Sequence, residues 1–356
     1  MVFWRREEGG VGAECELVGE EMATLVGNGV LVGFAGQALL SLCLSAWVFF
    51  LTKHGNMDIT HPEGSIGRQV ERRRLDFVSN ILMIGSDFQS TLGISYMITV
   101  FCQAQLMDTY HLHLAFDISS FVGVSNTAAL VCWRYCRAKI GDGNERVTWF
   151  HGRYRAAFIF VFLYLILTIL LCIRLGEWAP NTSPGRCYYS NLVTSPGASH
   201  PGDDQIYVSV TASWLIVVVL ASVFCGVGKR RTILALCSLH FPLHLYMTIA
   251  LRQANSGKFE GEVKHENEWD FGQTTAVILL VIALRELLAK GKEYYDFERR
   301  AAKHGMSRRG SGESVEKDQE ANHDSMESFL LRKNNNGDSE EAPRSSHPAL
   351  DGHSRF

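Results

Sequence analysis

The chain has 356 residues, of which 47% are hydrophobic, and its 34 Lys and Arg nearly balance its 37 Asp and Glu. The net charge of −3 says little by itself, and the positions of the charges say more. We expect no nucleic-acid partner. The length alone would allow two soluble domains, but the apolar residues are gathered into long runs with few charges. Runs of about 20 residues match the length that a helix needs to cross a bilayer, so the lipid bilayer is the expected partner.

Seven apolar runs are candidate membrane spans. They cover about residues 28–52, 77–103, 112–134, 155–175, 206–228, 232–251 and 270–290. The fifth and sixth are separated only by Gly228 and the basic residues 229–231, and together they are too long for one span. We therefore expect a tight helical hairpin there. The predicted fold class is all-α, a seven-helix transmembrane bundle over residues 28–290.

The positions of Lys and Arg predict how the bundle is oriented. If the N-terminal segment 1–27 lies outside, the inner segments carry 19 Lys and Arg and the outer segments carry 7. Because cytoplasmic loops are enriched in these residues, we expect an outside N-terminus and a cytoplasmic C-terminus. Residues 1–27 are charged and have no secretory signal, so the first span would be its own insertion signal. The plasma membrane or another secretory-pathway membrane is the expected location.

The outer loop at about 176–205 carries two candidate modifications. Asn181 begins the pattern Asn-Thr-Ser, an acceptor for glycosylation. Of nine cysteines, only Cys15, Cys102 and Cys187 fall on the predicted outer side. A Cys102–Cys187 disulfide is the candidate that would hold this loop over the helix ends. Two alternatives stay open, a bond to Cys15 or three free thiols, because connectivity cannot be deduced from sequence.

The C-terminal region is predicted to contain two parts. Residues 291–304 mix Tyr and Phe with Lys and Arg, which is typical of an interfacial helix on the inner membrane surface. Residues 305–356 are polar and poor in apolar side chains, which predicts a disordered cytoplasmic tail. Ser311 follows Arg309 by two residues and is a candidate phosphorylation site. The alternative is an incidental serine in a solvated tail.

Polar residues interrupt the second span at "SDFQST". Asp87 lies about 15 Å from the inner end of this span, at 1.5 Å per residue, which is near the middle of the membrane. Asn80 and Thr91 are seven and four positions away and share its helical face. Because a carboxylate in the membrane is costly, we expect this face to turn toward the bundle interior.

Matching polar residues occur in three later spans. The third span has His113, Asp117, Ser120 and Thr127 on one face, and we expect Asp117 to share a polar seam with Asp87. The sixth span places His240 and His244 four residues apart around Pro242, and the seventh has Gln273 near its outer end and Glu286 near its inner end. The candidate ligand-binding interior comprises Asp87, Gln89, Thr91, His113, Asp117, His240, His244 and Gln273.

Three interpretations of this interior compete. The side chains could simply form interhelical hydrogen bonds, each worth about 0.6 kcal/mol. They could line a pocket for an unknown small ligand or ion in a receptor or transporter. They could hold zinc through His240, His244 and Asp117 or Asp87, which would permit a hydrolytic reaction. No cofactor is expected outside this zinc alternative, and no catalytic residue is assigned.

Two motifs resemble a group of uncharacterised fungal integral membrane proteins. The matching positions are Asp87 and Gln89 in one span, Tyr110 and His111 at the start of the next, and Trp269, Phe271, Gly272 and Gln273 before the last. The resemblance covers three of the seven spans and implies a fungal multi-pass protein without a known activity.

Two other seven-helix families fit less of the chain. "CWRYC" at 132–136 has Trp133 where G-protein-coupled receptors have an acidic residue, and alkaline ceramidases carry their His-x-x-x-His in the last span rather than the sixth. We therefore expect a receptor-like or structural membrane protein that is not an enzyme. The alternative is a zinc-dependent, ceramidase-like hydrolase, and the third possibility is a small-solute transporter.

Overall fold

The computed structural model describes Cys15, Val18 and residues 22–53, 57–141, 152–180, 185–193, 200–259 and 269–303. The chain divides into two units, Met1–Asp296 and Phe297–Phe356, and all contacts discussed below lie within the first. Asn181, Ser311 and the predicted tail fall outside the described residues. The predicted glycosylation, phosphorylation and disorder therefore stay predictions.

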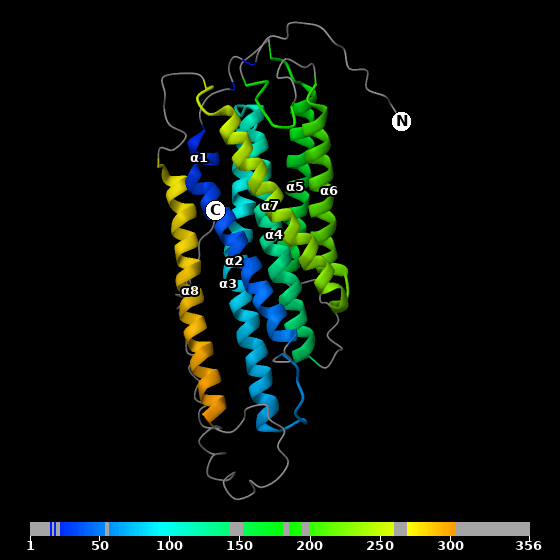
Figure 1. Cartoon of the computed structure of the whole chain (residues 1–356), viewed down its shortest axis with the longest axis vertical. Coiled ribbons are helices and arrows are strands. Elements are labelled where there is room, and N and C mark those ends of the chain that lie inside the picture. The colour runs from blue at the N-terminus through cyan, green and yellow to red at the C-terminus, as the bar shows by residue number, and fades with distance from the viewer. Residues whose placement is uncertain are drawn as a thin grey trace, which may run out of the picture. The chain divides into compact units, whose positions relative to one another are not determined.

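The described part of the chain is all-α, with seven long helices (Figure 1). A four-residue helix, α1 (Ala23–Val26), precedes them. The long helices are α2 (Asn28–Lys53), α3 (Ile66–Gln103), α4 (Thr109–Ile140), α5 (Gly152–Gly176), α6 (Gly202–Phe224), α7 (Arg230–Asn255) and α8 (Phe271–Lys303). Each overlaps one of the predicted apolar runs, although α6 ends at Phe224, four residues before the predicted end of the fifth run. The helix α8 continues without a break through the segment predicted to be a separate interfacial helix.

Six of these helices, α2 and α4 to α8, are long and apolar enough to cross a membrane. The exception is α3, whose first turns are charged and whose middle contains the polar stretch around Asp87. Composition therefore supports six candidate spans, one fewer than the seven predicted from sequence. The chain is a multi-pass helical membrane protein on these grounds.

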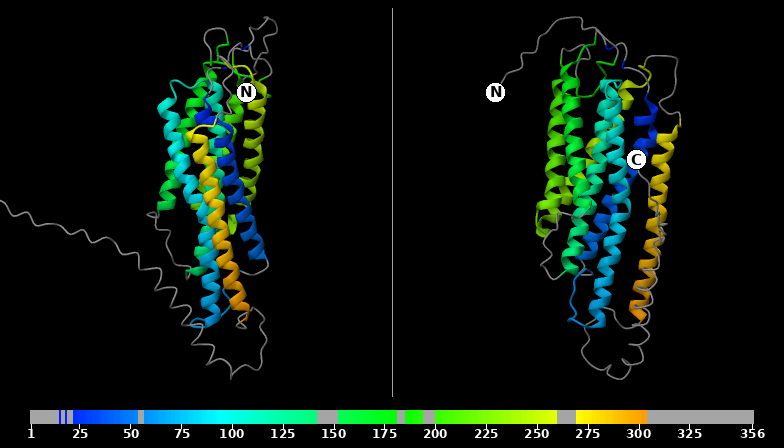
Figure 2. Two further views of the ribbon diagram at one scale, coloured as in Figure 1. Left: turned by 90° about the vertical axis from the view of Figure 1, so that its left-hand side faces the viewer. Right: turned by 180° about the vertical axis from the view of Figure 1, so that it is seen from behind.

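The helix α4 forms the centre of the bundle (Figure 2). Every residue from Thr109 to Trp133 is buried, and α4 packs against α2, α3, α5, α6 and α7. The helix begins where the Asp108 carboxylate accepts a 2.8 Å hydrogen bond from the backbone N–H of His111. A helix that is buried on all sides has no lipid-facing surface, so its polar side chains must find partners on neighbouring helices.

The hairpin predicted between the fifth and sixth apolar runs is confirmed. The short 3₁₀ helix Val227–Lys229 separates α6 from α7. Arg134 of α4 donates hydrogen bonds of 2.6 and 3.0 Å to the carbonyls of Ser222 and Cys225 at the end of α6. These bonds satisfy carbonyl groups that have no partner within their own helix.

The disulfide joins Cys15 to Cys187, with Cα atoms 5.9 Å apart. The candidate pairing of Cys187 with Cys102 is therefore wrong, and Cys102 is free and exposed at the end of α3. Hydrogen bonds to the start of α4 and the end of α7 fix the loop that carries Cys187. Thr109 N–H donates to Gly185 O, and the Asn255 side chain bonds both backbone groups of Tyr189. The Tyr189 hydroxyl also donates a 3.1 Å hydrogen bond to the carbonyl of Cys15, next to the disulfide.

Candidate functional site

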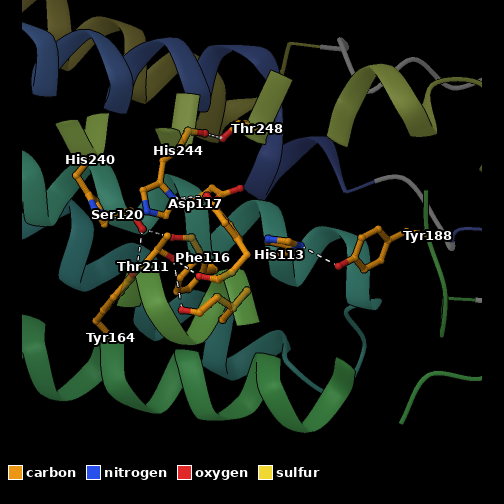
Figure 3. A network of polar contacts seen from close by, with 12 residues as sticks. His113, Phe116, Asp117, Ser120, Tyr164, Tyr188, Thr211, His240, His244 and Thr248 are labelled. Carbon is orange, nitrogen blue, oxygen red and sulfur yellow. Dashed lines mark hydrogen bonds and ion pairs between the residues drawn. The ribbon is translucent and has the colours of Figure 1, made fainter. Parts of the chain in front are cut away.

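A chain of polar side chains links α4 and α7 in the middle of the bundle (Figure 3). His244 Nδ1 lies 2.6 Å from Asp117 Oδ1, and the Nε2 atoms of His244 and His240 are 2.8 Å apart. All three side chains are buried. The predicted pairing of the two histidines on one face of their helix is confirmed by this contact, and so is the buried position of Asp117.

The helix α6 contributes a third element to this chain. The Tyr207 hydroxyl lies 3.3 Å from Asp117 Oδ1 and 3.2 Å from His244 Nδ1. The ring of Trp214, two helical turns further along α6, meets the His240 ring edge-on at 5.2 Å. The Tyr207 and Phe116 rings also contact the His244 ring, and both imidazoles are shielded from bulk water by burial.

A second series of hydrogen-bonded side chains runs toward the end of the bundle that carries the disulfide. We call this end of the bundle the disulfide end. His113 Nδ1 lies 2.9 Å from the Tyr188 hydroxyl, and this hydroxyl donates a 2.6 Å hydrogen bond to Asp204 Oδ2. Ser190 donates to Asp204 Oδ1 at 3.0 Å. Because the single hydroxyl proton of Tyr188 goes to Asp204, His113 Nδ1 must be the donor to the Tyr188 oxygen.

Three buried atoms along these two chains have no hydrogen-bond partner among the described residues: His113 Nε2, Asp117 Oδ2 and His240 Nδ1. With neutral histidines and an ionised Asp117, all three are acceptors. His244 Nδ1–H donates to Asp117, so His244 Nε2 accepts from His240 Nε2–H and leaves His240 Nδ1 without a proton. The two series of hydrogen-bonded side chains together have more hydrogen-bond acceptors than donors. We call them the core network.

The zinc alternative required His240, His244 and Asp117 to surround one point. Asp117 contacts Nδ1 of His244 and His240 contacts Nε2, so they lie on different edges of that ring. Among the described residues, no group of three or more His, Cys, Asp or Glu side chains is arranged to hold a metal ion. The three residues therefore do not form a converging zinc ligand set.

The structure separates Asp87 from this network. The side chain of Asp87 is 52% exposed and forms an ion pair with Arg153 of α5, with a shortest distance of 3.0 Å. Thr91 is also exposed and donates to the Asp87 carbonyl. The prediction that this face of α3 turns inward and shares a seam with Asp117 is therefore wrong. Polar residues occur on several sides of α3 between 86 and 91, so their spacing could not identify the inward face.

Two other predicted site residues lie elsewhere in the core. Gln89 is fully buried and donates hydrogen bonds to the carbonyls of Phe34 and Phe121, at 3.0 and 3.4 Å. Gln273 accepts a 3.0 Å bond from the backbone N–H of Gly29. Both therefore connect helices, Gln89 between α2, α3 and α4 and Gln273 between α2 and α8. The eight candidate residues are distributed over several places and do not line one pocket.

A cleft of about 430 Å³ opens between α3, α4 and α5. Six polar or aromatic residues line it: Asp87, Ser90, Thr91, Asn126, Trp133 and Arg153. We call it the lateral cleft. It is separate from the core network, because none of the network residues lines it.

Sequence reasoning missed four members of the core network: Tyr188, Ser190, Asp204 and Tyr207. Asp204 was excluded because the fifth span was expected to begin at residue 206, whereas α6 begins at Gly202. A signal was present, since Asp204, Tyr207 and Thr211 recur at spacings of three and four on one helical face. Tyr188 lies in a loop, where no periodicity could have identified it.

No protein-family model, curated protein sequence or solved structure matches the chain. Its class is therefore established by architecture alone. The helices α2 and α4 to α8 and the buried Asp117–His244–His240 contacts make it a multi-pass helical membrane protein with a polar interior.

Proposed function

We propose that the protein is a seven-span, receptor-like membrane protein and that the core network responds to a proton. In this proposal α3 is the seventh crossing, the N-terminus lies outside and the disulfide end faces outward. The resemblance to fungal multi-pass proteins supports only the multi-pass part of this proposal. Its matching residues Tyr110, His111 and Gln273 lie in the first turns of α4 and α8.

The excess of acceptors in the core network is the observation that carries this proposal. An ionised carboxylate is costly within a membrane unless a positive charge or several donors compensate it. Asp117 receives hydrogen bonds from His244 and Tyr207, while its second oxygen has no described partner. One added proton would neutralise the Asp117–His244–His240 part of the network and give a donor to one of the unpartnered acceptors.

A route for this proton runs from the disulfide end. Ser190, Asp204, Tyr188 and His113 form consecutive hydrogen bonds into the bundle. His113 and Asp117 are four residues apart on α4, and each has an unpartnered acceptor. A water molecule between them would complete the chain, because buried waters bridge such atoms.

A receptor fits this arrangement better than a transporter. Among the described residues, the hydrogen-bonded chain ends at His240. One turn before it on α7, the Cys237 thiol bonds to the carbonyl of Val124 instead of extending the chain. A proton that enters from one side and stops in the centre would alter the contacts between α4, α6 and α7. Such a change in helix packing is the event by which a receptor transmits a signal.

Proton uptake by the full-length protein in lipid nanodiscs tests the proposal. On acidification, we expect wild type to bind about one proton per protein molecule more than Asp117→Asn. In infrared difference spectra, wild type should gain the band of a buried protonated carboxyl group, and Asp117→Asn should lack this band. Asp203→Asn is the control, because Asp203 is exposed one residue from the network. We expect it to retain the buried-carboxyl band.

Backbone amide hydrogen exchange distinguishes a receptor function of the core network from a purely structural one. In wild type, acidification should change exchange in α6 and α7, and Asp117→Asn should abolish this change. If Asp117→Asn only lowers thermal stability and wild type shows no acid-dependent exchange in these helices, the network is structural and the proposal fails.

A further inference from the structure

The lateral cleft contains two buried polar side chains that the bundle leaves unused. Asn126 of α4 is 5% exposed and Ser90 of α3 is 8% exposed, and both line the cleft. Neither side chain forms a hydrogen bond with another described residue. Their polar atoms are accessible from the cleft, so a ligand bound there can form hydrogen bonds with both.

The charged residues of the cleft neutralise one another. Arg153 donates from Nε and Nη2 to the two carboxylate oxygens of Asp87, at 3.3 and 3.0 Å. The guanidinium also lies over the Trp133 ring, 5.0 Å from its centroid. The cleft therefore has no uncompensated charge. Its free groups are an amide and a hydroxyl, which both donate and accept, and they suit an uncharged hydroxyl group better than a phosphate or an ammonium.

The surroundings of the cleft are apolar and face outward. Phe88 and Ile98 of α3 are 46% and 49% exposed, and Ile159 and Phe162 of α5 are 48% and 63% exposed. These side chains belong to the same two helices as the cleft, which α5 lines with residues of its first two turns, Gly152, Arg153 and Ala156. A 25-residue helix is about 37 Å long, so its first turn falls near the boundary between headgroups and hydrocarbon.

We propose that the lateral cleft binds the hydroxyl-bearing head of an uncharged membrane amphiphile, a lipid alcohol. The hydroxyl bonds to Asn126 and Ser90, and the apolar part lies in the bilayer along α3 and α5. A cleft of about 430 Å³ is within the usual range for small-molecule sites. This site is independent of the proton response proposed for the core network.

Native mass spectrometry of the full-length protein in detergent tests this site. The probes are cholesterol and dioleoylglycerol, which share the hydroxyl but differ in the apolar part. Phosphatidylcholine is the comparison, because its zwitterionic headgroup has no free hydroxyl. We expect at least one of the two alcohols to bind more tightly than phosphatidylcholine. Comparing the two alcohols then shows whether a sterol or an acylglycerol is preferred.

Asn126→Leu and Ser90→Ala should each weaken binding of the preferred alcohol about tenfold, the effect of losing one hydrogen bond. Thr99→Val is the matched control, because Thr99 is exposed on α3 away from the cleft and bonds only to the Ser95 carbonyl. It should bind like wild type.

Ala156→Trp provides a second route if the buried substitutions prevent folding. Ala156 lines the cleft from α5 and is partly exposed, so a large side chain there fills the space without disturbing the core. We expect it to abolish binding of the alcohol. Equal binding of phosphatidylcholine and both alcohols, or unchanged binding in folded Asn126→Leu and Ala156→Trp proteins, would overturn the proposal.

Discussion

Glu71 is a buried carboxylate outside the predicted spans, near the start of α3. It accepts hydrogen bonds from the backbone N–H groups of Thr60 and His61, from the Thr60 hydroxyl at 2.7 Å and from His61 Nδ1 at 3.0 Å. Burial alone would raise the pKa of Glu71, but these hydrogen bonds together outweigh it and hold the pKa below its usual value of 4.5. The ionised carboxylate therefore anchors the α2–α3 connection.

This anchor predicts a loss of stability in acid. A group whose pKa is lowered by folding stabilises the native state above its unfolded pKa, and this contribution disappears as the pH falls through the folded value. We expect the thermal stability of wild type to fall below about pH 4.5, as measured in detergent. Glu71→Gln should lower the stability at neutral pH by about 1–3 kcal/mol and reduce the acid dependence.

Glu63→Gln is the control for this measurement. Glu63 is 75% exposed and pairs with Arg68 on the surface, where an ion pair contributes little. A stability profile of Glu71→Gln that coincides with those of wild type and Glu63→Gln would contradict the anchoring role.

Contacts between whole helices depend on small residues where α2 meets α8. A Cβ atom at Gly33 would lie 2.7 Å from the Cβ of Ala276 and 2.9 Å from backbone atoms of that residue. At Gly36, one turn further, an added Cβ would meet only the methyl end of the Leu280 side chain. The first contact is between backbones and the second is with a side chain that can move. Close approach through small residues is a common means of packing helices in membranes.

This difference predicts opposite effects for two similar substitutions. Gly33→Ala should destabilise the protein by about 1–3 kcal/mol, because α2 and α8 would have to separate. Gly36→Ala should be neutral or slightly stabilising, since alanine has the higher helix propensity and Leu280 can change rotamer. Thermal unfolding in one detergent compares the two variants. Equal stabilities would show that the α2–α8 contact does not limit stability.

At the scale of the whole molecule, the number of crossings depends on α3. Composition identifies six spans, yet α3 is 38 residues long and packs closely against α4 along the bundle (Figures 1 and 2). The polar stretch in the middle of α3 lines the lateral cleft, where Asp87 forms an ion pair with Arg153 of α5. A polar residue within a spanning helix is tolerated where protein or a cavity covers it.

Epitope tags at the two chain ends test the crossing number. With α3 as a seventh span, we expect an N-terminal tag to be accessible in intact cells and a C-terminal tag to become accessible only after permeabilisation. A tag inserted in the segment 142–151 between α4 and α5 should behave like the C-terminal tag. Accessibility of both ends from the same side would contradict seven crossings and the orientation assumed for the proton route.

The sequence predicted each long helix because an apolar run near the width of a bilayer has few other stable states. It also predicted the α6–α7 hairpin from the basic residues between two runs, and the His240–His244 pair from their helical spacing. It could not predict the environment of Asp87. Spacing shows which residues share a face, but the neighbouring helices decide which face is covered.

The sequence by itself determined the class of this protein, a bundle of long helices in a membrane, because hydrocarbon admits few other backbone structures. Only the tertiary structure decided three further features. These are the disulfide partner of Cys187, the placement of Asp87 in the lateral cleft, and the joining of Asp117 to His244, Tyr207 and His240. Each depends on how a helix or loop is rotated and placed against segments distant in the chain, and this is set by packing rather than by local periodicity.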